Sequence, residues 1–123
     1  MASTPTVKWL DSPEDHDYPA AAAYLSLLFP DSATAKYVAE LRKAPVSKFM
    51  AKDIFRASGL SLLGISNVHI ERDSKKITSG QALSPLLLVR SENNEKVIIA
   101  DGYHRMCAVY SFDEDAVIPC KIV

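Results

Sequence analysis

The residues best suited to chemistry form the segment DGYHR, residues 101–105. The short β-branched run before it, 97–99, predicts a strand covered on both faces, and the helical spacing of the apolar residues after it predicts a helix. We expect Asp101 to be the N-cap, so that the first-turn amides point out of the helix and can bind an anion. The cationic Arg105 and the titratable His104 in the same turn favour phosphate as that anion.

Asp101 has a second possible role, as a metal ligand or general base. A carboxylate beside a bound phosphate is repelled unless a cation lies between them, and Mg²⁺ commonly takes one or two carboxylates together with phosphate oxygens. His104 could contact the phosphate or carry protons near neutral pH. Gly102 would let the backbone approach the ligand closely. The alternative is that Asp101 only caps the helix and that His104 and Arg105 are a surface pair without function.

A second group of cations lies on the helix predicted for Val68–Ser79, which Gly80 would end. His69, Arg72 and Lys76 follow each other at i, i+3 and i+7, so their side chains share one face. This basic face is either simply solvated or the second half of a phosphate site. Lys76 is the first residue that we would assign to such a site.

The segment DGYHR, after VIIA and before a closing IPCKIV, resembles the signature of the ParB/sulfiredoxin superfamily over roughly residues 49–123. The resemblance implies an α+β fold in which a small mixed sheet is flanked by helices. Superfamily members include nucleotide-hydrolysing partition proteins, ATP-dependent sulfiredoxins, nucleases and a free-serine kinase, so the resemblance does not settle the reaction. The cofactors that we expect are a nucleotide (ATP or CTP) and, from the carboxylate beside its phosphates, Mg²⁺. From the residues of the turn we predict Asp101 and His104 as catalytic residues, with Asp101 also as the metal ligand. The implied cofactor-binding residues are Gly102, Tyr103, His104, Arg105, Lys76 and Arg72.

Two differences from the superfamily pattern argue against two of the activities known in the superfamily. Sulfiredoxins have a catalytic cysteine immediately before His-Arg, where this chain has Tyr103, and a phenol with a pKa near 10 is a poor replacement. We therefore do not expect sulfinic-acid reduction, and we interpret Cys107 and Cys120 as inert thiols. Partition proteins continue into a helix-turn-helix unit where this chain stops, so we do not expect sequence-specific DNA binding by that route.

Three functions remain, from different classes. The leading one is Mg²⁺-dependent hydrolysis of a nucleoside triphosphate or phosphoryl transfer at residues 101–105. The second is a non-catalytic module that senses a nucleotide or binds a partner. The third is a ParB-like nuclease, against which the net charge of −1 and the pI near 6.3 weigh, because proteins that bind the nucleic-acid backbone usually carry a basic excess.

Composition and patterning complete these expectations. The 123 residues, 48% hydrophobic and 24% charged, suit one compact domain, and the two cysteines indicate a reducing cytoplasm. We find no apolar run long enough to cross a membrane or to form a secretion signal, so we expect no membrane partner. Four carboxylates crowd around His16, and we interpret them as a solvated acidic loop rather than a metal site.

We expect an N-terminal arm (1–18), a helical hairpin (19–45) and a ParB/sulfiredoxin-like domain (46–123) within one compact unit. The hairpin, with helices predicted for Pro19–Phe29 and Ala33–Lys43, has no counterpart in the minimal superfamily core and could serve a protein partner or self-association. In the last part we predict a short helical segment at 55–63. The predicted strands are Lys48–Ile54, Leu86–Arg90, Val97–Ile99 and Ile118–Val123, with Pro119 indicating an edge or a strand start.

Overall fold

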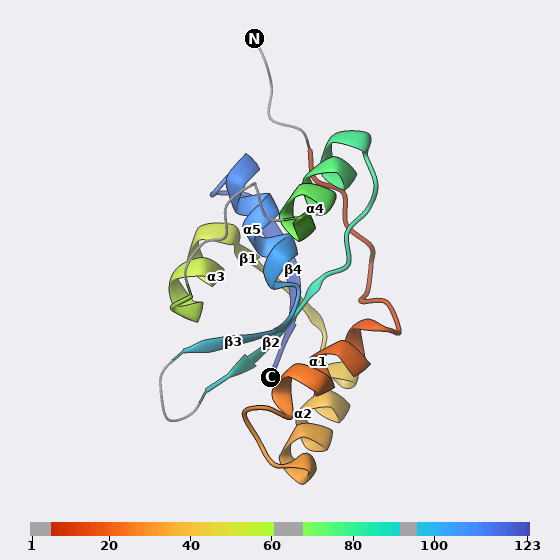
Figure 1. Ribbon diagram of the computed structural model, residues 1–123, viewed down its shortest axis with the longest axis vertical. Helices are drawn as coiled ribbons and strands as arrows, with labels where there is room; N and C mark the ends of the chain where they lie inside the picture. Colours follow the sequence, from red (N-terminus) through yellow and green to blue (C-terminus); the bar gives the residue numbers. More distant parts are fainter. Residues whose placement is uncertain (1–5, 61–67, 92–95) are drawn as a thin grey trace.

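The structure is a computed structural model that describes residues 6–60, 68–91 and 96–123, and the side chains of 68 and 69 are not described. These ranges contain five helices and four strands, which confirms the α+β class (Figure 1). The helices are α1 (Asp17–Leu25), α2 (Asp31–Lys43), α3 (Ala51–Ser58), α4 (Val68–Ser79) and α5 (Tyr103–Phe112). The strands are β1 (Val46–Met50), β2 (Leu86–Arg90), β3 (Val97–Asp101) and β4 (Val117–Ile122).

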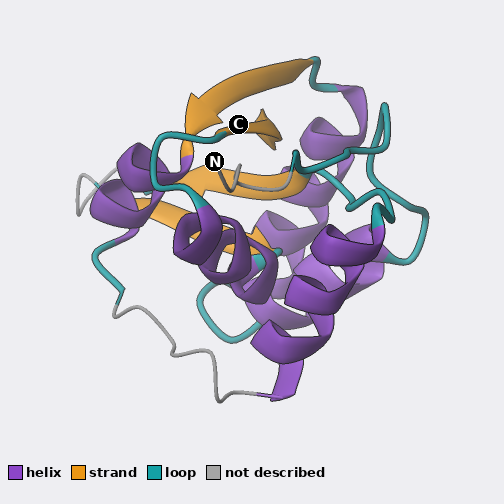
Figure 2. Cartoon of the chain, turned by 90° about the horizontal axis from the view of Figure 1, so that it is seen from above, coloured by secondary structure: helices purple, strands orange, loops and turns teal. Residues whose placement is uncertain are grey.

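The four strands form one mixed sheet in the order β1-β4-β2-β3. β4 pairs antiparallel with β1 and parallel with β2, and β2 pairs antiparallel with β3. In Figure 1, α4 and α5 lie toward the top and α1 and α2 toward the bottom, with β2 and β3 between them, and Figure 2 gives the perpendicular view. The continuous apolar run in β2 follows from this arrangement, because Leu86 and Leu88 pack into one core and Leu87 and Val89 into the other.

The predicted helical hairpin is present and packs directly on the sheet. Tyr18, Ala21 and Leu25 of α1 share a buried cluster with residues of β2 and β3. The C-terminus of α2 is held by Lys121 of β4, whose Nζ donates to the carbonyl oxygen of Arg42 at 2.9 Å although Lys121 is only 8% exposed. A buried lysine is tolerated here because the carbonyls at a helix C-terminus attract a cation.

The bounds of the hairpin helices differ from the prediction. α1 ends at Leu25 rather than at Phe29, and Pro30 is the N-cap of α2 in place of Asp31 or Ser32, which were expected to cap it. Proline suits this position because it lacks a backbone N–H, and an N–H at the start of a helix has no partner within the helix.

The strand predicted for Lys48–Ile54 is wrong in its second half, where the chain forms α3. The first amides of that helix are satisfied from a distant segment, because Ala51 N–H donates to Ala116 O at 2.8 Å and Lys52 N–H to Glu114 O at 2.9 Å. Gly59, with φ 66°, ends the helix in the left-handed conformation. The alternation of apolar residues in this segment therefore reflects the buried side of a helix, with Ile54 only 3% exposed.

Pro119 lies in an interior strand, but at a position that suits proline. β4 has both β1 and β2 as neighbours, yet the pairs with β2 begin only at Cys120. Pro119 itself pairs with Lys48 of β1, in the part of β4 before the pairs with β2 begin. The prediction of an edge strand or a strand start is therefore wrong, and proline is tolerated because β4 pairs with only one neighbour at this position.

The N-terminal arm is anchored beside the segment that leads into β2. Trp9 forms a parallel bridge with Leu83, Leu10 N–H donates to Leu83 O at 2.9 Å, and Leu83 N–H donates to Lys8 O at 2.9 Å. Trp9 also packs against the larger apolar core. Among the helices that the structure describes, none has the length and apolar character of a membrane span.

Candidate functional site

The strand-to-helix turn at residues 101–105 has the predicted outline but a different cap. β3 ends at Asp101, and Gly102 is the N-cap of α5 with φ 105°. The prediction that Asp101 caps the helix is therefore wrong, and its carboxylate instead pairs with Arg105. Glycine is required because a Cβ at position 102 would lie 2.7 Å from Leu86 Cγ and 2.9 Å from Arg105 Nη2.

Arg105 is a brace between the ends of two strands. Its Nη2 donates to Asp101 Oδ2 at 2.9 Å and to Pro85 O at 3.4 Å, and its Nε donates to Ser84 O at 3.0 Å. The arginine side chain is 17% exposed and that of Asp101 is 15% exposed, so this ion pair is largely shielded from water. Since three of the five guanidinium donors bind these oxygens, only the Nη1 end can be offered to a ligand.

A pocket of about 220 Å³, which we call the inner pocket, opens at this turn. Three of its residues come from α4 and four from the turn, so the tertiary structure brings together two groups of residues that the sequence marked separately. The lining residues are Arg72, Asp73, Lys76, Asp101, Gly102, His104 and Arg105. Six of the seven site residues predicted from the sequence are in this list.

Tyr103 is the exception among the predicted residues. Its ring packs against the apolar core instead of lining the inner pocket. Burial is the main cause that raises the pKa of the Tyr103 phenol above its ordinary value, and the neighbouring Cys107 adds to it. Tyr103 is therefore placed as a packing residue. The side chain of His69, the remaining residue of the basic face predicted on α4, lies outside the described residues.

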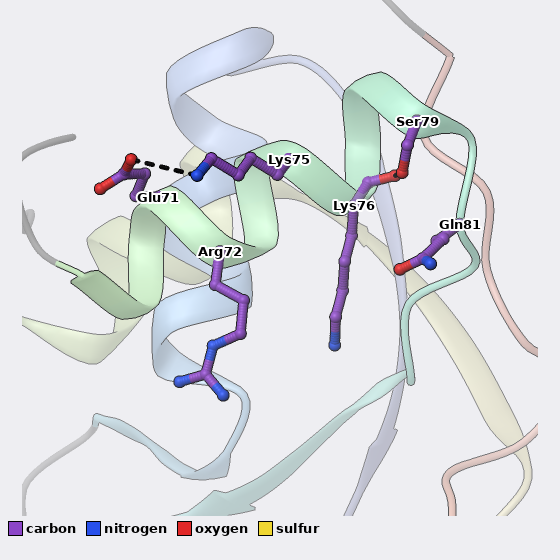
Figure 3. Close-up of a pocket in the computed structure, with 6 residues that line it drawn as sticks. All are labelled: Glu71, Arg72, Lys75, Lys76, Ser79 and Gln81. Carbon is purple, nitrogen blue, oxygen red and sulfur yellow. Dashed lines mark hydrogen bonds and ion pairs between the residues drawn. The ribbon is translucent and has the colours of Figure 1, made fainter.

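A second pocket of about 540 Å³, the outer pocket, adjoins the first along α4. It is lined by Glu71, Arg72, Lys75, Lys76, Ser79 and Gln81. Arg72 and Lys76 belong to both pockets, and Figure 3 shows them extending from α4 in the same direction. Lys75 instead turns toward Glu71, with Nζ 3.4 Å from Oε1.

Cations outnumber carboxylates in the inner pocket. Arg72, Lys76 and Arg105 face Asp73 and Asp101, and His104 can add a further positive charge. One of these anions is already neutralised by Arg105, so Arg72 and Lys76 act mainly against a single carboxylate. Together with the positive end of α5, this balance favours an anionic ligand.

Asp17, which the sequence did not indicate as a site residue, is buried next to Asp101. This first residue of α1 is 2% exposed, accepts a hydrogen bond from Glu14 N–H at 2.9 Å and lies beside Asp101. Burial raises the pKa of Asp101, Arg105 opposes the rise, and the nearby Asp17 carboxylate increases it. No sequence signal connects residues 84 positions apart, so only the packing of α1 on β3 could reveal this contact.

Two of the four carboxylates around His16, those of Glu14 and Asp17, lie close to its imidazole. The interpretation of this group as a solvated loop is wrong for Asp17, which is 2% exposed and begins α1. His16 Nδ1 lies 3.2 Å from Glu14 Oε2, and Nε2 lies 3.4 Å from Asp17 Oδ1. Within residues 6–60, 68–91 and 96–123, no group of three or more histidine, cysteine, aspartate or glutamate side chains could hold a metal ion. A metal ion at the candidate site would therefore need oxygen atoms from its ligand as well.

No protein-family model, no curated protein and no solved structure matches this chain. The relationship to the ParB/sulfiredoxin superfamily accordingly stays a prediction, and the function has to be argued from the site itself.

Proposed function

We propose that the inner pocket binds the phosphates of a nucleotide. The observation that carries this proposal is the meeting of Arg72 and Lys76 with the glycine-led start of α5, from parts of the chain that the sequence marked separately. First-turn amides supply fixed donors for phosphate oxygens, and the two cations supply charge from the opposite side. Arg105 contributes mainly by holding the turn in shape.

The sizes of the pockets agree with a phosphorylated ligand of moderate length. Sites that enclose a whole small molecule usually measure roughly 300–1,000 Å³. The inner pocket, at about 220 Å³, is smaller than this and suits a phosphate group or a short phosphate chain. The outer pocket, at about 540 Å³, gives room for the rest of the ligand without a break in the lining, since Arg72 and Lys76 are shared.

Mg²⁺-dependent hydrolysis or phosphoryl transfer is the activity that we assign to this site. The donor set fits the ion, because the pocket presents the carboxylates of Asp101 and Asp73 and Mg²⁺ commonly takes one or two carboxylates with phosphate oxygens. Asp101 has Oδ2 on Arg105 and would hold the ion together with Asp73. Bound Mg²⁺ would neutralise phosphate charge, and His104 in the lining would exchange a proton near neutral pH.

Binding without turnover is a second candidate, favoured by one specific contact. Asp101 and Arg105 are the two charged residues of the turn, and they form an ion pair with each other. Arg105 also donates hydrogen bonds to backbone carbonyls of the segment before β2. Such a brace preserves the shape of a binding pocket whether or not a reaction occurs. Under this alternative, the site senses a nucleotide and the α1–α2 hairpin offers the surface for a partner.

The proposal is tested by comparing Lys76→Gln and Arg72→Gln with Arg56→Gln, an exposed cation on α3 outside both pockets. Isothermal titration with ATP and CTP should show a loss of about 10- to 100-fold for the two pocket variants, the worth of one charged hydrogen bond. Arg56→Gln should bind as the wild type does. Equal binding of ATP and CTP by all four proteins would exclude the inner pocket.

Turnover and the metal are tested separately. We expect EDTA to weaken nucleotide binding while leaving the melting temperature of the unliganded protein unchanged, because no all-protein metal cage is present in the described ranges. Mg²⁺-dependent release of phosphate would support the enzyme. Tight nucleotide binding with no product over hours would instead support the sensing module.

A further inference from the structure

The outer pocket has a lining that suits phosphate better than a nucleobase. Arg72, Lys75 and Lys76 supply cations, and Ser79 and Gln81 supply neutral polar groups. Among the described residues of this lining, none is aromatic, whereas protein sites for bases typically provide a ring or an apolar wall for stacking. A base placed here would lose water without gaining a stacking partner.

A further cation from another part of the chain lies near the C-terminal end of α4, although it is not among the residues that line the outer pocket. A Cβ at Gly80 would lie 3.6 Å from Lys8 Nζ, so the Lys8 ammonium group is beside the residue that separates Ser79 from Gln81. Lys8 is fixed there through its backbone, since its carbonyl oxygen accepts a hydrogen bond from Leu83 N–H at 2.9 Å. A positive charge therefore also lies beside the residue that follows α4.

We propose that the outer pocket is a second phosphate subsite, so that the ligand is a linear chain of phosphates running past Arg72 and Lys76 from one pocket into the other. This inference rests on the proposed function of the inner pocket and names the class of ligand. The chain is either inorganic polyphosphate or the polyphosphate part of a nucleotide. In the second case the base projects into solvent, and the site does not distinguish one base from another.

Glu71 and Lys75 set the strength of the outer subsite in opposite directions. Their side chains are 54% and 77% exposed, they lie 3.4 Å apart, and they line the outer pocket only. Glu71 draws the Lys75 ammonium group toward itself, as Figure 3 shows, and its carboxylate would also repel phosphate. Lys75→Gln should therefore weaken a polyphosphate and Glu71→Gln should strengthen it, and both variants should fold because the changes are at the surface.

The test is a calorimetric titration of the full chain at about 0.15 M salt, which screens charges beyond about 8 Å. The ligands are inorganic phosphate, tripolyphosphate, AMP, ATP and CTP. We expect tripolyphosphate, ATP and CTP to bind within about threefold of one another and more tightly than phosphate or AMP. Lys75→Gln should lower, and Glu71→Gln should raise, the tripolyphosphate affinity by about three- to fivefold, with inorganic phosphate unchanged.

The outcomes separate this inference from the proposed function. If ATP binds more than about tenfold tighter than tripolyphosphate, or AMP binds as tightly as ATP, the base is recognised and the second subsite is refuted, while nucleotide binding stands. If Lys75→Gln and Glu71→Gln leave tripolyphosphate binding unchanged, the inference is refuted in the same way. If none of the five ligands binds, both the inference and the proposed function are wrong.

Discussion

Replacing Gly102 by alanine tests whether the turn is held as tightly as the structure indicates. Gly102 has φ 105°, a conformation that residues with a side chain rarely adopt, and the new Cβ would lie 2.7 Å from Leu86 Cγ. It would also lie 2.9 Å from Arg105 Nη2, within the brace that joins Asp101 to the segment before β2. Relief of either contact has to move a buried leucine or the ion pair.

The expected loss follows from two separate effects. The left-handed conformation costs about 1–2 kcal/mol for a residue with a Cβ, and forcing a methyl group into a filled space costs about 1–3 kcal/mol. The free energy of unfolding should therefore fall by about 2–5 kcal/mol, a large part of the roughly 5–15 kcal/mol that natural domains have. At about 4 °C for each kcal/mol, the melting temperature should fall by about 8–20 °C.

Gly80→Ala is the matched control, because it has the same kind of backbone without the crowding. Gly80 has φ 79°, and the nearest atom to its added Cβ is the flexible end of Lys8 at 3.6 Å. Only the conformational cost of about 1–2 kcal/mol should appear. Urea unfolding of both variants gives the comparison, and a loss at Gly102 no larger than at Gly80 would refute the close packing.

A double variant identifies the residue responsible for the crowding. Leu86→Ala removes the nearest atom and by itself costs about 2–5 kcal/mol, because Leu86 is fully buried. If the clash is real, Gly102→Ala combined with Leu86→Ala should lose less stability than the sum of the two single variants. Strict additivity would show that the added methyl group does not meet Leu86.

Four further outcomes follow from the buried polar groups. Arg105→Gln should lower the free energy of unfolding of the unliganded protein by about 2–3 kcal/mol, because it removes a shielded ion pair and its hydrogen bonds. Lys121→Ala should cost about 1.5–3 kcal/mol through the lost charged hydrogen bond to the end of α2, measured by urea unfolding. Burial raises the pKa of the Cys120 thiol to about 12, so iodoacetamide at pH 8 should label it only after unfolding. Because the pKa of Asp101 is raised above its ordinary value of 3.8, the folded state binds more protons than the unfolded state above that pH, and this contribution to stability is lost as pH rises through the raised pKa. Asp17→Asn should therefore gain stability relative to the wild type as pH increases from about 4 toward 7, measured by melting temperature.

Each of these outcomes has a control or a contrary result. Lys52→Ala, which removes a solvent-exposed ion pair with Asp115, should leave stability nearly unchanged next to Lys121→Ala. Asp15→Asn, an exposed change near Asp17, should run parallel to the wild type across the pH range. An unchanged melting temperature for Arg105→Gln would show that this arginine is not a brace, and rapid labelling of native Cys120 would show that β4 opens readily.

Much of the local structure of this protein was determined by its sequence. The apolar run at 86–89 predicted the strand 86–90, which is β2, and the predicted helix 68–79 has the bounds of α4. Glycine at 102 also marked the turn correctly, because a left-handed backbone at a helix start needs that residue. Such features depend on the period of a few neighbouring residues and on backbone sterics, which a sequence displays directly.

Tertiary packing alone decided how the candidate site is assembled. It placed α4 opposite the start of α5 and packed Tyr103 against the core. It also paired Asp101 with Arg105, although the sequence predicted Asp101 as a helix cap and Arg105 as a residue that contacts phosphate. It also brought Asp17 of α1 beside Asp101. The physical reason is that strand order and helix placement depend on which apolar faces cover each other, and these faces come from segments far apart in the chain.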